Sequence, residues 1–208
     1  WTVSGAGSKL QIENGATLIT PAAVTLSASA IFQIDNGGIY KHQNTGAWAS
    51  TIFQGIESFG NTSTVEINST ATTLPSNSTY GHLIINLTTD PGADLSFNGV
   101  LTTINGSLTI ANTQSRVIQL GTSTSSSLSI ANNLSISGTS VFAFTAGTGS
   151  PDITVNGNVT VSGGELDFCS SSASGSSTLN VKGNFSHTGG SVTRHSHISI
   201  YGDIRRSC

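Results

Sequence analysis

The chain has 208 residues, a net charge of −3 and only 8% charged residues. Its seven basic residues form no stripe, which argues against a nucleic-acid partner. No apolar run approaches the length of about 18 residues that a membrane-spanning helix needs. Disorder is excluded because 36% of the residues are hydrophobic and recur periodically, whereas disordered chains combine low hydrophobicity with high net charge.

Residues 9–40 contain a repeat. Residues 10–15 (LQIENG) recur as residues 32–37 (FQIDNG), 22 positions later. Each copy alternates apolar and polar residues, as a strand with one buried face does, and each ends in the turn-forming dipeptide Asn-Gly.

Residues 41–63 interrupt this rhythm. Trp48, Phe53 and Phe59 stand among polar residues without clear alternation. We interpret the segment as an excursion from one coil that folds back over the stack. The three aromatic residues then either cover an apolar face or the open end of the stack, or form a binding platform for a sugar ring or a partner. Strand-like alternation returns at residues 64–68, 80–87 and 95–99.

Residues 103–192 contain four further copies, which begin at residues 103, 129, 154 and 180, at offsets of 26, 25 and 26. A period of this size is typical of stacked repeats. Two columns of the alignment accept only Gly or Asn, the residues that best tolerate positive φ, so we predict left-handed corners there. The first column is Gly106, Asn132, Gly157 and Gly183, and the second is Asn112, Gly138, Gly163 and Gly189.

Strands are predicted between and after these corners. Apolar residues alternate with Ser and Thr between the columns, and a third strand is expected at residues 117–120, 141–144 and 166–168. A last column holds polar side chains that we expect to hydrogen-bond along the stack, as amide ladders do. Its members are Ser107, Asn133, Asn158 and Asn184.

Together these patterns predict an all-β chain: one parallel β-helix, or β-solenoid, over residues 1–208, with about eight coils of 22–26 residues. We expect it to be right-handed, from the usual chirality of parallel connections. Residues 193–208 lose the pattern and are interpreted as either a cap or a truncated end. Because the chain opens on Trp1 and has no Met, we expect it to be a mature or excised piece of a longer protein.

Several of these segments resemble a repeat region of large secreted surface proteins of Bacteroidota, which are typically exported by the type IX secretion system. The segments that carry the resemblance are residues 63–67 (STVEI), 73–75 (TLP), 80–85 (YGHLII), 104–109 (INGSLT) and 179–190 (LNVKGNFSHTGG). The resemblance covers residues 60–192. It implies a secreted or cell-surface filamentous region and brings no catalytic residues with it.

Groups that could support catalysis are sparse. Lys9, Lys41, Arg116 and Lys182 fall on different coils, so no cationic groove for cleaving acidic polysaccharides is predicted. Glu165 and Asp167 are the nearest pair of acids, and we interpret them as surface carboxylates. We therefore predict no enzyme and no cofactor.

Metal and disulfide sites are not predicted either. His187, His195 and His197 lack an evident third ligand, so no metal site is expected. Cys169 and Cys208 are the only cysteines, and either a disulfide or two separate thiols remains open.

The expected function is a non-catalytic structural or adhesive segment of a secreted or cell-surface protein, acting as a spacer, filament or display scaffold. The partners considered are an extracellular polysaccharide, a surface protein, or another copy of the chain that associates end to end or laterally. One alternative is a carbohydrate-binding or polysaccharide-cleaving β-helix. Another is an ice-binding face built on the outward column Thr109, Ser135, Thr160 and Ser186.

Overall fold

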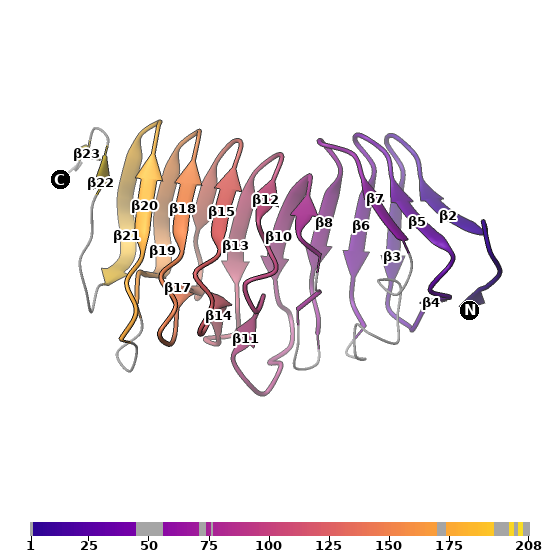
Figure 1. Ribbon diagram of the computed structural model, residues 1–208, viewed down its shortest axis with the longest axis horizontal. Coiled ribbons are helices and arrows are strands. Elements are labelled where there is room, and N and C mark those ends of the chain that lie inside the picture. The colour runs from indigo at the N-terminus through magenta and orange to yellow at the C-terminus, as the bar shows by residue number, and fades with distance from the viewer. Residues whose placement is uncertain are drawn as a thin grey trace.

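The computed structural model describes residues 2–44, 56–70, 74–75, 77–169, 174–193, 200–201 and 204–205. These residues form a β-solenoid of about seven turns, without a helix, in which parallel strands stack along one axis (Figure 1). The predicted all-β parallel β-helix is confirmed. Its right-handed sense stays a prediction.

The strands of successive coils line three faces (Figure 1). The first face holds β2 (Lys9–Ile12), β5 (Ile31–Ile34), β7 (Ile56–Phe59), β9 (Thr79–Tyr80), β12 (Thr103–Ile104), β15 (Ser127–Ile130), β18 (Asp152–Val155), β20 (Thr178–Val181) and β22 (Ile200–Tyr201). The second holds β3 (Thr17–Thr20), β6 (Ile39–His42), β8 (Thr64–Ile67), β10 (His82–Asn86), β13 (Leu108–Asn112), β16 (Leu134–Ile136), β19 (Val159–Asp167), β21 (Phe185–Thr193) and β23 (Ile204–Arg205). The third holds β1 (Thr2–Val3), β4 (Thr25–Leu26), β11 (Leu95–Ser96), β14 (Val117–Gly121) and β17 (Val141–Thr145), and continues into the C-terminal halves of β19 and β21.

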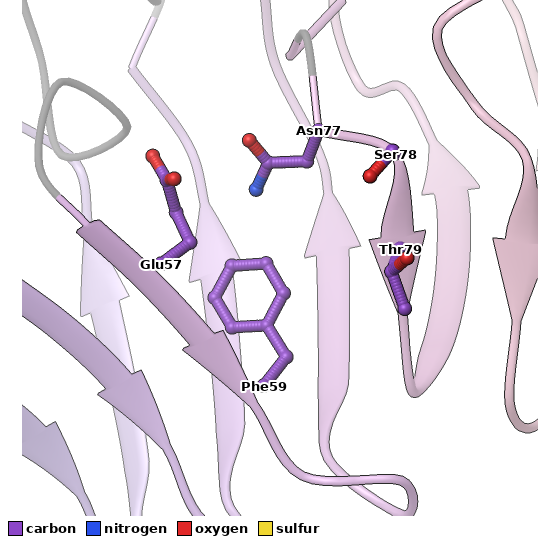
Figure 2. A pocket seen from close by; sticks show the side chains of 5 residues that line it. All are labelled: Glu57, Phe59, Asn77, Ser78 and Thr79. Atoms are coloured by element: carbon purple, nitrogen blue, oxygen red, sulfur yellow. The ribbon is translucent and has the colours of Figure 1, made fainter.

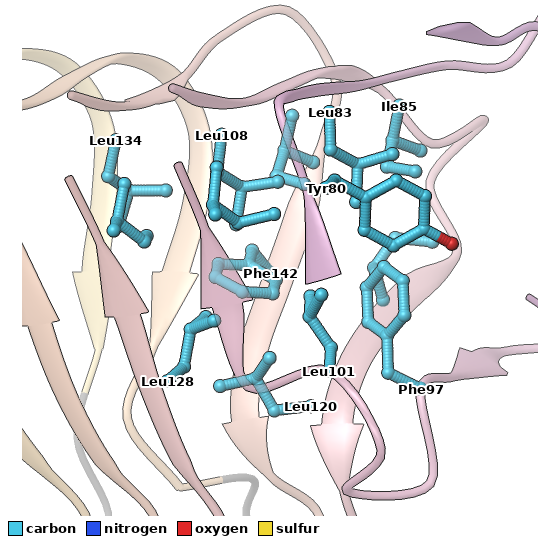
Figure 3. Packing of buried hydrophobic residues seen from close by; sticks show 14 of the residues in the cluster. Tyr80, Leu83, Ile85, Phe97, Leu101, Leu108, Leu120, Leu128, Leu134 and Phe142 are labelled. Carbon is cyan, nitrogen blue, oxygen red and sulfur yellow. The ribbon is translucent and has the colours of Figure 1, made fainter. Parts of the chain in front are cut away.

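Register places like residues above one another. On the second face Leu108 pairs with Leu134, Leu134 with Val159, and Val159 with Phe185. The alternation seen in the sequence points these side chains inward, where apolar residues from all three faces meet (Figure 3). Burying a side chain of this size contributes about 1.5–3 kcal/mol, so the stacked interior is the main stabilising element.

The first Gly/Asn column has a different cause from the one predicted. None of Gly106, Asn132, Gly157 and Gly183 has a positive φ, so the left-handed assignment is wrong for all four. Crowding explains the glycines instead. A Cβ on Gly157 would lie 2.5 Å from Asn133 Oδ1 of the preceding coil, and a Cβ on Gly183 would lie 2.5 Å from Asn158 Oδ1.

The second column follows the prediction only at Gly138, whose φ is 63°. Asn112, Gly163 and Gly189 do not have positive φ, and the prediction is wrong for them. The left-handed residue lies further along the chain in those coils, because the corner is shifted relative to the sequence alignment. It falls on Gln114 and Ser115 in the first copy, on Gly164 in the third and on Gly190 in the fourth.

The last column forms a ladder, as predicted, but one that joins side chains to backbone. Ser107 Oγ accepts a hydrogen bond from Asn133 N, Asn133 Oδ1 from Asn158 N, and Asn158 Oδ1 from Asn184 N, at 3.3, 2.8 and 2.8 Å. His82 begins the series, because its Nδ1 accepts from Ser107 N at 3.0 Å. Each corner N–H is thus satisfied by the coil before it.

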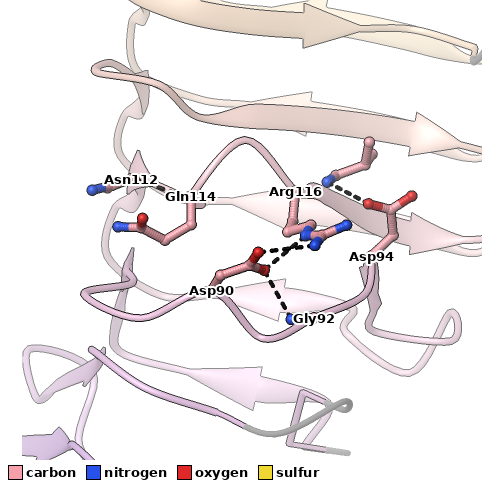
Figure 4. A network of polar contacts seen from close by, with 7 residues as sticks. Asp90, Gly92, Asp94, Asn112, Gln114 and Arg116 are labelled. Atoms are coloured by element: carbon pink, nitrogen blue, oxygen red, sulfur yellow. Dashed lines mark hydrogen bonds and ion pairs between the residues drawn. The ribbon is translucent and has the colours of Figure 1, made fainter.

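A second set of polar contacts joins coils beside the third face (Figure 4). Arg116 donates from Nε and Nη2 to the two carboxylate oxygens of Asp90, at 2.7 and 2.9 Å. The guanidinium lowers the pKa of Asp90 to about 2. Asp94 accepts from Val117 N at 2.9 Å, and Gln114 donates to Leu87 O at 2.8 Å. Arg116 therefore serves as a link between coils.

Candidate functional site

The first face is divided into two sheets. β7 pairs with β5 and β9 pairs with β12, but no pairing joins β7 to β9 in the described residues. Behind them, β8 and β10 of the same two coils are paired in register. The break coincides with a short coil: Asn68 and Asn86 are 18 residues apart, whereas His82 and Ser107 are 25 apart. The shorter coil supplies only the two residues of β9 to the first face.

A hollow of about 380 Å³ occupies this break (Figure 2). The two strands approach at one end, where the ring of Phe59 stacks on Tyr80 with centroids 5.6 Å apart and planes inclined by 25°. Gly81 permits this approach, since a Cβ there would lie 2.5 Å from Gly60 O. At the other end Glu57 and Asn77 face each other above the Phe59 ring (Figure 2). The residues that line the hollow are Glu57, Phe59, Asn77, Ser78 and Thr79.

The polar groups at the wide end are poorly solvated. Burial raises the pKa of the Glu57 carboxyl above its ordinary value. The Nδ2 atom of Asn77 is buried and has no hydrogen-bond partner among the described residues. The same holds for the hydroxyl of Tyr80 beneath the Phe59 ring, and burial raises its pKa. The hollow therefore presents a donor, an acceptor and an aromatic ring.

A second hollow of about 440 Å³ also borders on Phe59, next to Gln33, Asp35 and Asn36. Its charged group, the Asp35 carboxylate, already accepts hydrogen bonds from within the chain. Gln11 Nε2 donates to Asp35 at 2.6 Å, Gln33 Nε2 also donates to it, and these two hydrogen bonds lower the pKa of Asp35. The first hollow, with its unsatisfied amide, is the better candidate for a binding site.

The structure describes the two ends of the predicted excursion at residues 41–63, whereas residues 45–55 lie outside the described residues. Both ends belong to regular coils, because residues 41–42 lie in β6 and residues 56–59 form β7. Of the predicted binding residues, Phe59 lines both hollows and also packs edge-on against Phe32 at 5.8 Å. Trp48 and Phe53 lie outside the described residues.

Glu57 and Asn77 were not predicted from the sequence as site residues. The available signal was the short spacing between the strands at residues 64–67 and 82–85, which marks an incomplete coil.

The other candidate groups have structural roles. Lys41 Nζ lies 2.8 Å from Glu66 Oε2 on the neighbouring strand. Asp167 is buried and accepts from Cys169 N at 3.0 Å, so its interpretation as a surface carboxylate is wrong. Glu165 accepts from Thr193 Oγ1 at 2.5 Å.

His187 is exposed and shares a hydrogen bond with Gly190 O. The described part of the chain contains no group of three or more potential metal ligands. Cys169 is buried, with Sγ donating to Gly175 O at 3.2 Å. His195, His197 and Cys208 lie outside the described residues.

The outward column on the second face is in register, from Thr109 through Ser135 and Thr160 to Ser186. On the preceding coils the column continues with Ile84 and Glu66, so the hydroxyl row does not run the length of the face. No described segment is a helix long and apolar enough to cross a membrane.

A buried polar chain lies inside the first coils. Tyr40 OH is 2.9 Å from Thr20 Oγ1 and 2.8 Å from His42 Nδ1. His42 is only 1% exposed, and burial lowers its pKa to about 4. A neutral histidine in this position satisfies polar neighbours within the apolar interior.

The stacked parallel strands and the hydrogen-bond ladder at their corners define the chain as a β-solenoid. No protein-family model, curated protein or solved structure matches it.

Proposed function

We propose that the chain is a non-catalytic scaffold segment of a secreted or cell-surface protein, acting as a spacer or as a display and adhesion platform. The observation that carries the proposal is the uninterrupted second face, on which parallel strands follow one another from β3 to β21 and on to β23. At about 4.8 Å per strand, this stack forms a rod roughly 40 Å long.

The chemistry of the chain supports the same proposal. The charged groups Lys41, Glu66, Asp90 and Arg116 are used in contacts between coils. A stack held by backbone pairing, interior packing and the His82–Asn184 ladder needs few charges, which fits a chain with 8% charged residues. The resemblance to repeat regions of Bacteroidota surface proteins supports export by the type IX secretion system.

Two experiments test the proposal. In the first, the chain is incubated with a panel of neutral and acidic polysaccharides while new reducing ends and unsaturated products are followed. No turnover is expected, and turnover that depends on the folded chain would contradict a scaffold role. In the second, the chain is fused to a type IX sorting domain in a Bacteroidota host. External protease should reach a tag on the fusion in intact cells; a fusion retained inside the cells contradicts the surface assignment.

A further inference from the structure

We propose that the hollow between β7 and β9 binds a neutral sugar ring of an extracellular polysaccharide. Sugar binding goes beyond the scaffold function, because a rod needs no ligand. Either the scaffold function or the sugar site can therefore fail its test while the other holds.

The break in the first face creates an unsatisfied donor. Asn77 lies within the short coil, just before β9, and reaches the hollow from that side, while Glu57 reaches it from β7 (Figure 2). Because Asn77 Nδ2 is buried without a partner among the described residues, it carries a desolvation cost of the kind that hydrogen bonding normally offsets. A ligand oxygen placed between Asn77 and Glu57 would satisfy it.

The opposite side of the hollow supplies the complementary acceptor. The Glu57 carboxylate is half-buried, and hydrogen bonds from ligand hydroxyls to an ionised carboxylate are stronger than those between neutral groups. The exposed residues Ser78 and Thr79 add hydroxyls at the rim. A ligand carrying several hydroxyl groups can both donate to Glu57 and accept from Asn77.

The ring of Phe59 selects the shape of the ligand. It lies below the two polar groups (Figure 2). Its own position is fixed by stacking on Tyr80 and by the edge contact with Phe32. An aromatic floor with a few converging polar groups is the usual make-up of a small-molecule site, and about 380 Å³ lies within the usual size range. A pyranose ring has a C–H face for Phe59 and hydroxyls around its edge for Glu57 and Asn77.

Charge selects the class of sugar. Glu57 is the one titratable residue among the five described residues that line the hollow. A negative group without a neighbouring cation disfavours uronic acids and sulfated or phosphorylated sugars. The expected ligand is therefore a neutral glycan.

The test is an NMR titration of the ¹⁵N-labelled chain with the neutral hexasaccharides cellohexaose, maltohexaose, xylohexaose and mannohexaose, each up to about 10 mM. At least one should shift the side-chain amide of Asn77 saturably, whereas a hexagalacturonate should not. Asn77→Ala and Glu57→Gln should each weaken binding by about tenfold, as expected for the loss of one buried hydrogen bond. Asn180→Ala, an outward asparagine of β20 on the same face, is the matched control and should bind as the original chain does.

Three results would overturn the proposal: no saturable shift at Asn77 with any neutral probe, equal binding of hexagalacturonate, or unchanged affinity in both hollow variants. Glu57→Gln preserves the shape of the side chain and guards against a variant that fails to fold. The dispersion of each variant's spectrum reports folding directly.

Discussion

The contact between His82 and Gly106 allows one design rule of this solenoid to be tested in isolation. The three atoms nearest to a Cβ on Gly106 all belong to the His82 ring, and the closest lie at 2.6 Å. Where the ladder residue is the short Ser107 instead, the next coil carries Asn132, which has a Cβ. At Gly157 and Gly183 a backbone oxygen of the preceding coil lies as close to the Cβ position as the acceptor side chain does, so Gly106 is the position at which the acceptor alone can be tested. We infer the rule that a long acceptor requires glycine above it and a short acceptor does not.

The contacts of His82 and Gly106 determine the expected loss of stability in each variant. Gly106→Ala must either compress the contact or expel the His82 ring, which would leave Ser107 N without its acceptor, so we expect a loss of about 1–3 kcal/mol. His82→Ser alone removes one hydrogen bond and should cost about 0.5–1.5 kcal/mol. In the double variant the serine leaves room for the new methyl group, so the total loss should be close to that of His82→Ser alone.

Urea unfolding followed by circular dichroism measures these free energies, and for a chain of this size about 1 kcal/mol corresponds to about 2–4 °C in melting temperature. The expected coupling between the two sites is at least about 1 kcal/mol. Additive losses would refute the proposed link between acceptor length and glycine.

Three further predictions concern the interior and the ladder. Since the pKa of His42 is about 4 when folded and 6.5 otherwise, the unfolded chain gains the proton first, and stability should fall as the pH drops from 6.5 towards 4. The fall attributable to this group is up to about 3 kcal/mol, and His42→Gln should remove it from pH-dependent unfolding curves. Ile153→Ala should lower the free energy of unfolding by about 2–5 kcal/mol in urea unfolding, because the Ile153 side chain is buried. Thr154→Ala, at the next residue, whose side chain points outward, should change it by less than about 0.5 kcal/mol. Equal effects would contradict the inward position of Ile153 and the outward position of Thr154. Asn133→Ala should cost about 1 kcal/mol and speed hydrogen exchange at the Asn158 amide, and unchanged exchange would argue against the ladder.

The fold was predictable because alternation and period act together. Leu108, Leu134 and Val159 repeat at spacings of 26 and 25 residues, and pairing each strand one residue out of place would turn it outward, so the register follows from the apolar alternation. The Asn-Gly corners at Gly15 and Gly37 were also readable, since both glycines have positive φ, but Gly106 and Gly157 also follow Asn and do not have positive φ.

The role of the first glycine column was not predictable from one coil. A Cβ on Gly157 would lie 2.5 Å from both the backbone oxygen of Asn132 and Oδ1 of Asn133, residues that precede it by a full coil. A glycine demanded by a neighbouring coil and one demanded by its own φ look identical in a sequence. The distinction needs the stacking geometry.

The candidate site was only partly predictable. Phe59 stood out as an aromatic residue, but Glu57 and Asn77 are ordinary polar residues that become unusual only where β7 and β9 separate. That separation depends on how a coil 18 residues long packs between longer ones, which is a property of the stack.

Distances measured along the second face by electron spin resonance test the stacking of coils most directly. Nitroxide labels are placed in pairs, with one label at Ser186 and the other at Thr109, Ile84 or Glu66, which lie in the same outward column. Double electron–electron resonance should give distances that increase by about 4.8 Å for each coil between the labels. Distances that fail to grow steadily with the number of coils would contradict a single parallel stack.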